Sequence, residues 1–161
     1  MRRAVFLDRD GVLLDHNGSV FPGTKAALDR LKAEGFLLIV VTNQPDIATG
    51  KMNRDALDRV HKNLNLILPL DAILVCPHVD GDKCSCRKPK PGMILQAAKA
   101  HNIDLGHSYI VGDRWRDIGA GKEAGVQTIL IGTGYGELFP VKPDFRVADL
   151  DTAVSLILEN A

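Results

Sequence analysis

Two aspartates separated by one residue, Asp8 and Asp10, come directly after a short apolar segment near the start of the chain. A third aspartate, Asp113, follows another apolar segment. Three carboxylates form an all-oxygen ligand set, which is the kind that Mg²⁺ prefers. A calcium-binding loop is a poor match, because Gly11 follows Asp10 directly and no glutamate stands six residues after this glycine. Taken alone, Asp8 and Asp10 could also be residues that cap a turn.

Groups that could contact a phosphate occur elsewhere in the chain. Thr42 follows six apolar residues, and its hydroxyl could donate to a phosphoryl oxygen or simply close a strand. Lys88 could reduce the repulsion between carboxylates and hold a phosphate, or it could lie in a solvated basic loop. Asp117, four residues after Asp113, could lie beside the metal ligands or favour the start of a helix.

Sulfur and imidazole ligands form a separate cluster. Three cysteines and one histidine fall within eleven residues: Cys76, His78, Cys84 and Cys86. Three thiolates and one imidazole match a closed tetrahedral Zn²⁺ site, which is structural because no coordination position stays open. The odd number of cysteines argues against a disulfide framework. No basic helix follows the cluster, so it does not resemble a zinc finger that binds nucleic acid.

Short apolar segments alternate with amphipathic segments along the chain. The expected strands are Ala4–Leu7, Phe36–Val41, Ala72–Val75, Tyr109–Val111 and Thr128–Ile131. The expected helices begin near Gly23, Asn53, Pro91, Ile118 and Asp149. Strands that are apolar throughout are typical of a sheet covered on both faces. The sequence therefore predicts an α/β fold, an open parallel Rossmann-like sheet with helices on both faces.

The candidate residues share one edge of this predicted sheet. The first four strands are followed by Asp8, Thr42, Cys76 and Asp113, and open α/β sheets bind ligands at the carboxyl ends of their strands. The longest irregular stretch, residues 76–90, contains the zinc cluster, and loops of this length in a compact domain are usually functional.

Two glycine-rich stretches do not add to this picture. Gly119–Gly121 and Gly132–Gly136 lack the spacing of a dinucleotide fingerprint or a P-loop. Helix–strand packing is the expected reason for the first stretch, and a plain turn for the second.

The composition fits one globular domain that spans residues 1–161. Hydrophobic residues make up 45%, and 20 basic residues balance 20 acidic ones. A net charge of zero argues against electrostatic binding to nucleic acid or to an anionic membrane. No apolar run reaches about 18 residues, the length needed to span a bilayer. The N-terminal segment reaches a charged residue too early for a signal peptide, so a cytoplasmic protein is expected. We also expect the protein to be a monomer.

Four segments resemble, in order, the motifs of phosphatases of the haloacid dehalogenase (HAD) superfamily: Asp8–Val12, Thr42–Gln44, Arg87–Pro89 and Gly112–Asp113. The Cys-x-His and Cys-x-Cys pairs before Arg87 narrow the resemblance to the heptose-bisphosphate phosphatases and their relatives, the histidinol-phosphate phosphatases. Such enzymes are Mg²⁺-dependent phosphate-monoester hydrolases without a large cap domain. A zinc-binding loop is part of the fold that this resemblance implies.

The resemblance implies a role for each matching residue. Asp8 would be the nucleophile that forms an aspartyl-phosphate, and Asp10 the general acid and base. The Mg²⁺ ligands would be Asp8, the backbone carbonyl of Asp10, and Asp113. Thr42 and Lys88 would hold the phosphoryl group. The substrate-binding positions would be Asn43, Arg87 and Arg114.

A small phosphorylated metabolite is therefore the expected partner, and removal of the 7-phosphate of a heptose 1,7-bisphosphate is the first expectation. Segments 42–48 and 91–93 favour the heptose enzymes, although Asp15–Pro22 is shorter than is usual there. Histidinol phosphate or another sugar phosphate is the alternative substrate. A phosphotransferase would need a device that excludes water. A non-catalytic zinc-bearing interaction module would have no need for an intact set of catalytic residues.

Overall fold

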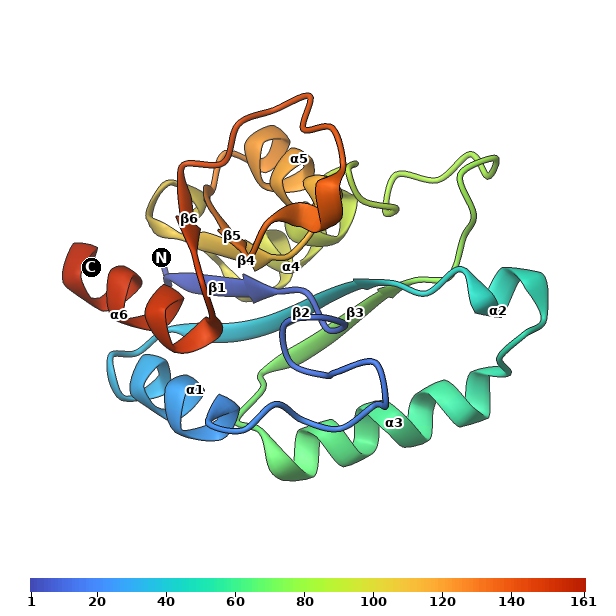
Figure 1. Cartoon of the computed structure of the whole chain (residues 1–161), viewed down its shortest axis with the longest axis horizontal. Coiled ribbons are helices and arrows are strands. Elements are labelled where there is room, and N and C mark those ends of the chain that lie inside the picture. Colours follow the sequence, from blue (N-terminus) through green and yellow to red (C-terminus); the bar gives the residue numbers. More distant parts are fainter.

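The order of the strands brings distant parts of the sequence to one edge. The computed structural model describes residues 1–161, with six parallel strands in the order β3-β2-β1-β4-β5-β6 (Figure 1). The strands are β1 (Ala4–Leu7), β2 (Leu37–Asn43), β3 (Ala72–Cys76), β4 (Tyr109–Gly112), β5 (Gln127–Ile131) and β6 (Phe145–Val147). The winding direction reverses between β1 and β4, and open α/β sheets bind their ligands at such a reversal.

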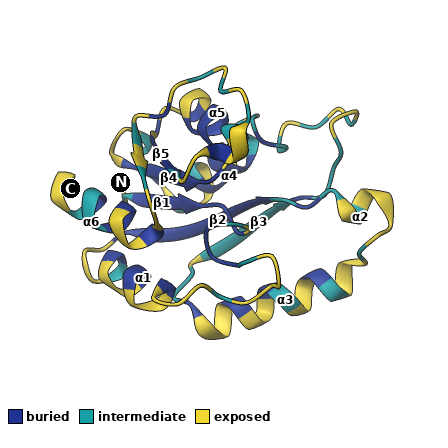
Figure 2. Ribbon diagram, viewed as in Figure 1, coloured by how far each residue is buried: buried dark blue, intermediate teal, exposed yellow.

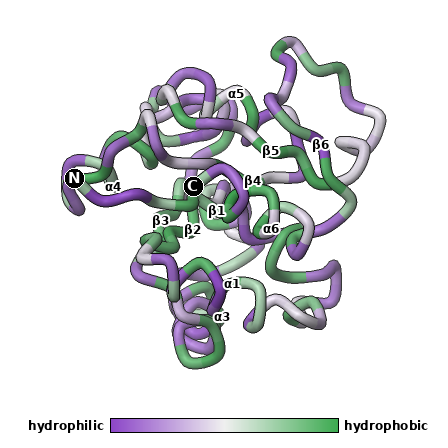
Figure 3. The backbone as a smooth tube through the Cα atoms, turned by 90° about the vertical axis from the view of Figure 1, so that its left-hand side faces the viewer, coloured by the Kyte–Doolittle hydropathy of each residue, from purple (hydrophilic) through white to green (hydrophobic).

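Helices cover both faces of the sheet, as the apolar strands predict. They are α1 (Thr24–Ala33), α2 (Asp46–Thr49), α3 (Arg54–Ile67), α4 (Gly92–His101), α5 (Trp115–Ala124) and α6 (Leu150–Asn160). Helices α1, α3 and α6 pack on one face, and α4 and α5 pack on the other (Figure 1). The central strands β1, β2 and β4 are buried, whereas β3 and β6 at the two edges are mostly half-buried (Figure 2). Hydrophobic residues concentrate in the strands of the sheet (Figure 3). None of the helices is both long and apolar enough to cross a membrane.

The predicted helix starts are confirmed at two caps. Asn53 Oδ1 accepts a hydrogen bond from the Ala56 backbone at 2.8 Å, and Asp149 Oδ1 accepts one from Thr152 at 2.8 Å. Packing explains the glycines of α5, as expected, because a Cβ at Gly121 would lie 2.4 Å from the Ile110 side chain on β4.

Several predicted bounds are wrong in detail. Strand β2 begins at Leu37 and runs on to Asn43, because Thr42 and Asn43 pair with Val75 and Cys76 of β3. Helix α5 begins at Trp115 rather than Ile118. The sequence does not predict helix α2 or the edge strand β6, because they have only four and three residues and too little apolar patterning.

Candidate active site

Three aspartates meet where β1 and β4 end. Asp8, Asp113 and Asp117 are all buried, and each offers an oxygen within 4.8 Å of the others. Asp8 follows β1, Asp113 follows β4, and Asp117 lies in the first turn of α5. Burial and the negative charges of Asp117 and Asp113 raise the pKa of Asp8, although Lys88 opposes them. Three carboxylates face one lysine, so the cluster has the charge and the oxygen atoms to hold a divalent cation.

Lys88 is the cation of this cluster and is only 3% exposed. Its Nζ donates to Asp8 Oδ1 at 2.9 Å, to Asp117 Oδ1 at 2.6 Å and to the Val41 carbonyl at 2.8 Å. These three bonds use all the donors of an ammonium group. Burial acts to lower the pKa of Lys88, but the carboxylates of Asp117 and Asp8 outweigh it and raise that pKa.

The end of β2 supplies three polar side chains with different contacts. Thr42 Oγ1 accepts from Gln44 Nε2 at 2.9 Å, which leaves the threonine hydrogen free to donate elsewhere. Asn43, expected at the substrate, lines the cavity beside Asp8 and also binds both backbone groups of Lys88. Its Nδ2 donates to the carbonyl at 3.1 Å and its Oδ1 accepts from the amide at 3.0 Å. Asn43 therefore fixes the main chain that carries Lys88.

Asp10 is exposed and is not part of the three-carboxylate cluster, although it lines the same cavity as Asp8 and Asp117. Arg9 donates to both of its carboxylate oxygens, at 2.9 and 3.1 Å, and Gln44 Nε2 donates at 3.1 Å. Behind Arg9 lies His61 of α3, 3.1 Å from Nη1. Burial and the Arg9 charge lower the pKa of His61 to about 4, so the ring is neutral and can accept this bond.

Three arginines surround a cavity of about 230 Å³ beside Asp8 and Lys88. Arg87 Nε lies 2.8 Å from Asp80, and Arg116 binds both oxygens of the same carboxylate at 2.9 and 3.1 Å. Arg114 pairs with Glu137 at 2.5 Å. The cavity has no hydrophobic lining residue. Four basic side chains, the three arginines and Lys88, thus line the cavity beside Asp8, Asp10 and Asp117, and arginines are well suited to bind phosphate groups.

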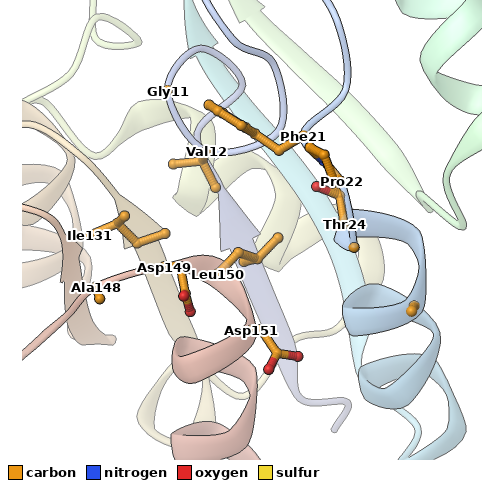
Figure 4. Close-up of a pocket in the computed structure, with 12 residues that line it drawn as sticks. Gly11, Val12, Phe21, Pro22, Thr24, Ile131, Ala148, Asp149, Leu150 and Asp151 are labelled. Carbon is orange, nitrogen blue, oxygen red and sulfur yellow. The ribbon is translucent and has the colours of Figure 1, made fainter.

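A larger hollow of about 450 Å³ lies next to Gly11 and Val12, between the turn after β1 and the start of α6 (Figure 4). Phe21 and Leu150 line it together with Asp149 and no basic residue. This lining does not suit a phosphate, so the smaller basic cavity is the candidate substrate site.

The turn at Gly132–Gly136 is more than the plain turn that the sequence analysis expects. Tyr135 reaches back from it and donates to Asp113 Oδ2 at 2.5 Å, while its ring lies under the Arg114 guanidinium, 4.5 Å from ring centroid to Cζ. The hydrogen bond to Asp113 and burial raise the pKa of Tyr135 to about 12, so the hydroxyl remains a donor.

The four predicted zinc ligands converge. Cys76 Sγ lies 3.4 Å from His78 Nδ1 and 3.9 Å from Cys84 Sγ, and His78 Nδ1 lies 3.3 Å from Cys86 Sγ. A tetrahedral zinc ion would hold two sulfurs about 3.8 Å apart and a sulfur and a nitrogen about 3.5 Å apart. The spacing of these atoms thus matches one metal ion without rearrangement.

Seven residues with contacts in the site have no role assigned from the sequence: Arg9, Gln44, His61, Asp80, Arg116, Tyr135 and Glu137. Arg9 and Gln44 stand inside the quoted motifs, so their side chains could have been considered there. No sequence motif identifies the other five. Of these, His61, Arg116 and Tyr135 reach the site only through the packing of α3, α5 and the turn after β5.

The chain is similar in sequence and in fold to several known proteins. Residues 85–153 match the model of a HAD-hydrolase-like family. The D-glycero-beta-D-manno-heptose-1,7-bisphosphate 7-phosphatase of Pasteurella multocida is 42% identical, over 83% of this chain and 84% of that protein. The enzyme of the same name from Escherichia coli K12 is 37% identical, over 88% of this chain and 83% of that protein. A crystal structure of D,D-heptose 1,7-bisphosphate phosphatase from B. bronchiseptica with magnesium and phosphate superposes with a TM-score of 0.85, at 31% identity over 99% of both chains.

Proposed function

The chain belongs to the family of the D-glycero-beta-D-manno-heptose-1,7-bisphosphate 7-phosphatases, and on that basis we propose that it removes the 7-phosphate of this sugar by hydrolysis. The observation that carries the proposal is the position of Asp8, a buried carboxylate at the end of β1 that Lys88 orients and that Asp113 and Asp117 flank. A carboxylate held in this way can act as a nucleophile toward phosphorus.

The carboxylate cluster fits Mg²⁺. Asp113 Oδ1 is buried and has no hydrogen-bond partner, although the other oxygen of the same carboxylate has one. An unsatisfied buried oxygen in a cluster of three aspartates is a natural ligand for a hard cation. We propose Asp8, Asp113 and the backbone carbonyl of Asp10 as the protein ligands. When bound there, magnesium would neutralise charge on the phosphoryl oxygens.

The chemistry then falls to four side chains. Asp8 attacks phosphorus, a bond forms between its carboxylate oxygen and the phosphorus, and the bond from phosphorus to the sugar oxygen breaks. Asp10 gives its proton to the departing alkoxide. Water then attacks the aspartyl-phosphate, Asp10 takes the proton of this water, and Asp8 is released with inorganic phosphate. Lys88 and the Thr42 hydroxyl stabilise the charge of the transferring group.

Arg9 and Gln44 set the position of the Asp10 carboxylate in the structure. They hold its carboxylate outside the metal cluster and on the side of the basic cavity, which Asp10 also lines. Asp10 has to leave its ion pair with Arg9 to carry a proton. We therefore propose that substrate binding breaks the contact between Arg9 and Asp10.

The charge of the cavity supports a bisphosphate over histidinol phosphate. Arg87, Arg114 and Arg116 line the same cavity as Asp8, and we propose that the remote end of the substrate lies against them. A second phosphate would pair with them, whereas the cationic amine of histidinol phosphate would be repelled. We propose that residues 1–161 form one catalytic domain that acts as a monomer on this small molecule.

A substrate panel tests the proposal. The full chain with Mg²⁺ is offered the heptose 1,7-bisphosphate, histidinol phosphate and p-nitrophenyl phosphate, and released phosphate is measured, with EDTA as the control. We expect the highest kcat/KM for the heptose bisphosphate and a product that keeps its 1-phosphate by phosphorus NMR. A preference for histidinol phosphate would overturn the substrate, and no phosphate release from any of the three would overturn the phosphatase.

We propose that Zn²⁺ occupies the cluster of Cys76, His78, Cys84 and Cys86 and holds the loop that carries Lys88. Arg87 and Lys88 follow Cys86 directly, and few apolar contacts hold the loop between Val79 and Ser85, where burial is at most partial. Metal binding at a closed site can order such a segment.

Cys86→Ser is therefore expected to lower kcat on the order of 100-fold, because a displacement of about 1 Å at a catalytic group can cost this much. Zinc content, kcat and Mg²⁺ dependence are measured on the same preparation, and Ser85→Ala serves as the matched control in the same loop. A zinc-free variant with wild-type kcat would show that the metal has no part in positioning Lys88.

A further inference from the structure

Tyr135 has a backbone conformation that its residue type disfavours. Its φ is 58°, in the left-handed region, and it is the central residue of the turn Gly134–Gly136 after β5. A bulky aromatic residue in this region is an outlier that the surroundings must stabilise. The glycines before and after it also have positive φ values, so this turn is built to place one aromatic side chain.

Two contacts fix the side chain of Tyr135. Its hydroxyl donates to Asp113 Oδ2 at 2.5 Å, and its ring lies 4.5 Å from the Arg114 guanidinium carbon. Gly11 leaves the space for the first contact, because a Cβ there would lie 1.9 Å from Asp113 Oδ2 and 3.0 Å from the tyrosine oxygen. Any other residue at position 11 would push Asp113 and Tyr135 out of this arrangement.

The hydrogen bond from Tyr135 makes the two carboxylate oxygens of Asp113 different. Oδ2 accepts from Tyr135, whereas Oδ1 is buried without a hydrogen-bond partner, and Asp113 belongs to the carboxylate cluster with Asp8 and Asp117. A carboxylate with one oxygen pinned cannot rotate freely, so the other oxygen keeps its direction. Groups that hold a metal ligand in this manner contribute to metal affinity without touching the metal.

We propose that Tyr135 is a positioning residue of the Mg²⁺ site, whose hydroxyl aims Asp113 Oδ1 at the cation. This inference rests on the proposed function, since it presupposes that Asp113 is a metal ligand. The tyrosine ring has a separate effect: it supports Arg114, which lines the substrate cavity. The hydroxyl and the ring therefore act on different steps.

Tyr135→Phe removes the hydroxyl and keeps the ring. Mn²⁺ binding to the full chain without substrate is followed by electron paramagnetic resonance of the free ion, with Mg²⁺ as competitor. We expect both ions to bind about tenfold more weakly, while KM for the heptose bisphosphate at saturating Mg²⁺ stays the same. Tyr135→Ala should lose the same metal affinity and also raise this KM. Tyr109→Phe, the only other tyrosine, is the matched control and should bind as the wild type does.

The outcomes separate the inference from its premise. Unchanged Mn²⁺ and Mg²⁺ affinity in Tyr135→Phe, alongside loss of binding in Asp113→Asn, would overturn the role of Tyr135 and leave the metal site standing. Wild-type binding that Asp113→Asn does not alter would overturn the metal site itself. A fall in melting temperature of Tyr135→Phe in EDTA, with no change in metal affinity relative to the folded fraction, would assign the hydroxyl to the fold and also overturn the inference.

Discussion

Asp8→Asn is expected to abolish turnover, with kcat lowered at least on the order of 1,000-fold. An amide oxygen is a far weaker nucleophile than a carboxylate, and no other carboxylate in the cluster follows β1, so the covalent step has no substitute. The measurement is phosphate release from the heptose bisphosphate under saturating Mg²⁺. Beryllium fluoride, which mimics the aspartyl-phosphate, should inhibit the wild type and fail to bind the variant.

The fold is expected to tolerate this change. Burial raises the pKa of Asp8, which means that the ionised carboxylate is costly at this position, and a neutral amide of the same size avoids this cost. The melting temperature in EDTA should therefore stay the same or rise. Asp29→Asn on the exposed face of α1 makes the same chemical change away from the site and should retain full activity. Activity of Asp8→Asn within tenfold of the wild type, with deamidation excluded by mass spectrometry, would contradict the aspartyl-phosphate mechanism.

The sequence predicts well which residues lie at the carboxyl edge of the sheet, because the end of each apolar strand segment can be recognised in the sequence. Asp8 and Asp113 directly follow apolar segments, and β1 and β4 are neighbours, so their carboxylates had to meet once the sheet formed. The zinc ligands were predictable for a similar reason, since all four lie within one loop and at the end of one strand. Local order and strand adjacency are enough to place these groups.

Other contacts depend on geometry that no local pattern encodes. The amphipathic pattern of α3 indicates only that His61 is a core position. Its contact with Arg9 depends on how α3 packs against the sheet. Tyr135 reaches Asp113 only because of the backbone path through a turn of glycines. Asn43 stands in a motif, yet its amide is used by the Lys88 backbone, 45 residues away. Such side chains are identified by packing and not by spacing.

Asp117 shows how one residue can fulfil two expectations that the sequence presents as alternatives. Its Oδ2 accepts from the Arg114 backbone at 3.1 Å and starts α5, while its Oδ1 accepts from Lys88 at 2.6 Å. The carboxylate of Asp117 therefore links the first turn of α5 to Lys88 of the catalytic cluster. This connection explains why α5 begins three residues before its apolar pattern does.

Lys88→Met is expected to impair both the fold and the reaction. Methionine keeps the unbranched shape of lysine and is one heavy atom shorter, but it leaves Asp8 and Asp117 buried without their cation. Breaking a buried pair in this way costs about 3–5 kcal/mol of unfolding free energy. Removal of one charge that stabilises the transferring phosphoryl group should lower kcat on the order of 100- to 1,000-fold. Denaturant unfolding in EDTA and phosphate release under saturating Mg²⁺ measure the two effects separately.

The pH dependence identifies the cause of the instability. Without Lys88 the buried carboxylate of Asp8 holds its proton more tightly in the folded chain than in the unfolded chain, because burial already raises the pKa of Asp8 even with the lysine present. A group whose pKa is raised by folding stabilises the fold at low pH and loses this effect as the pH rises. The stability deficit of Lys88→Met relative to the wild type should therefore grow from acidic to neutral pH. Mg²⁺, which would partly replace the missing charge, should raise the melting temperature of the variant more than that of the wild type. Lys90→Met, two residues further on and exposed, is the matched control and should change neither quantity. A deficit that stays constant with pH would mean that the lysine stabilises the loop through packing rather than through charge.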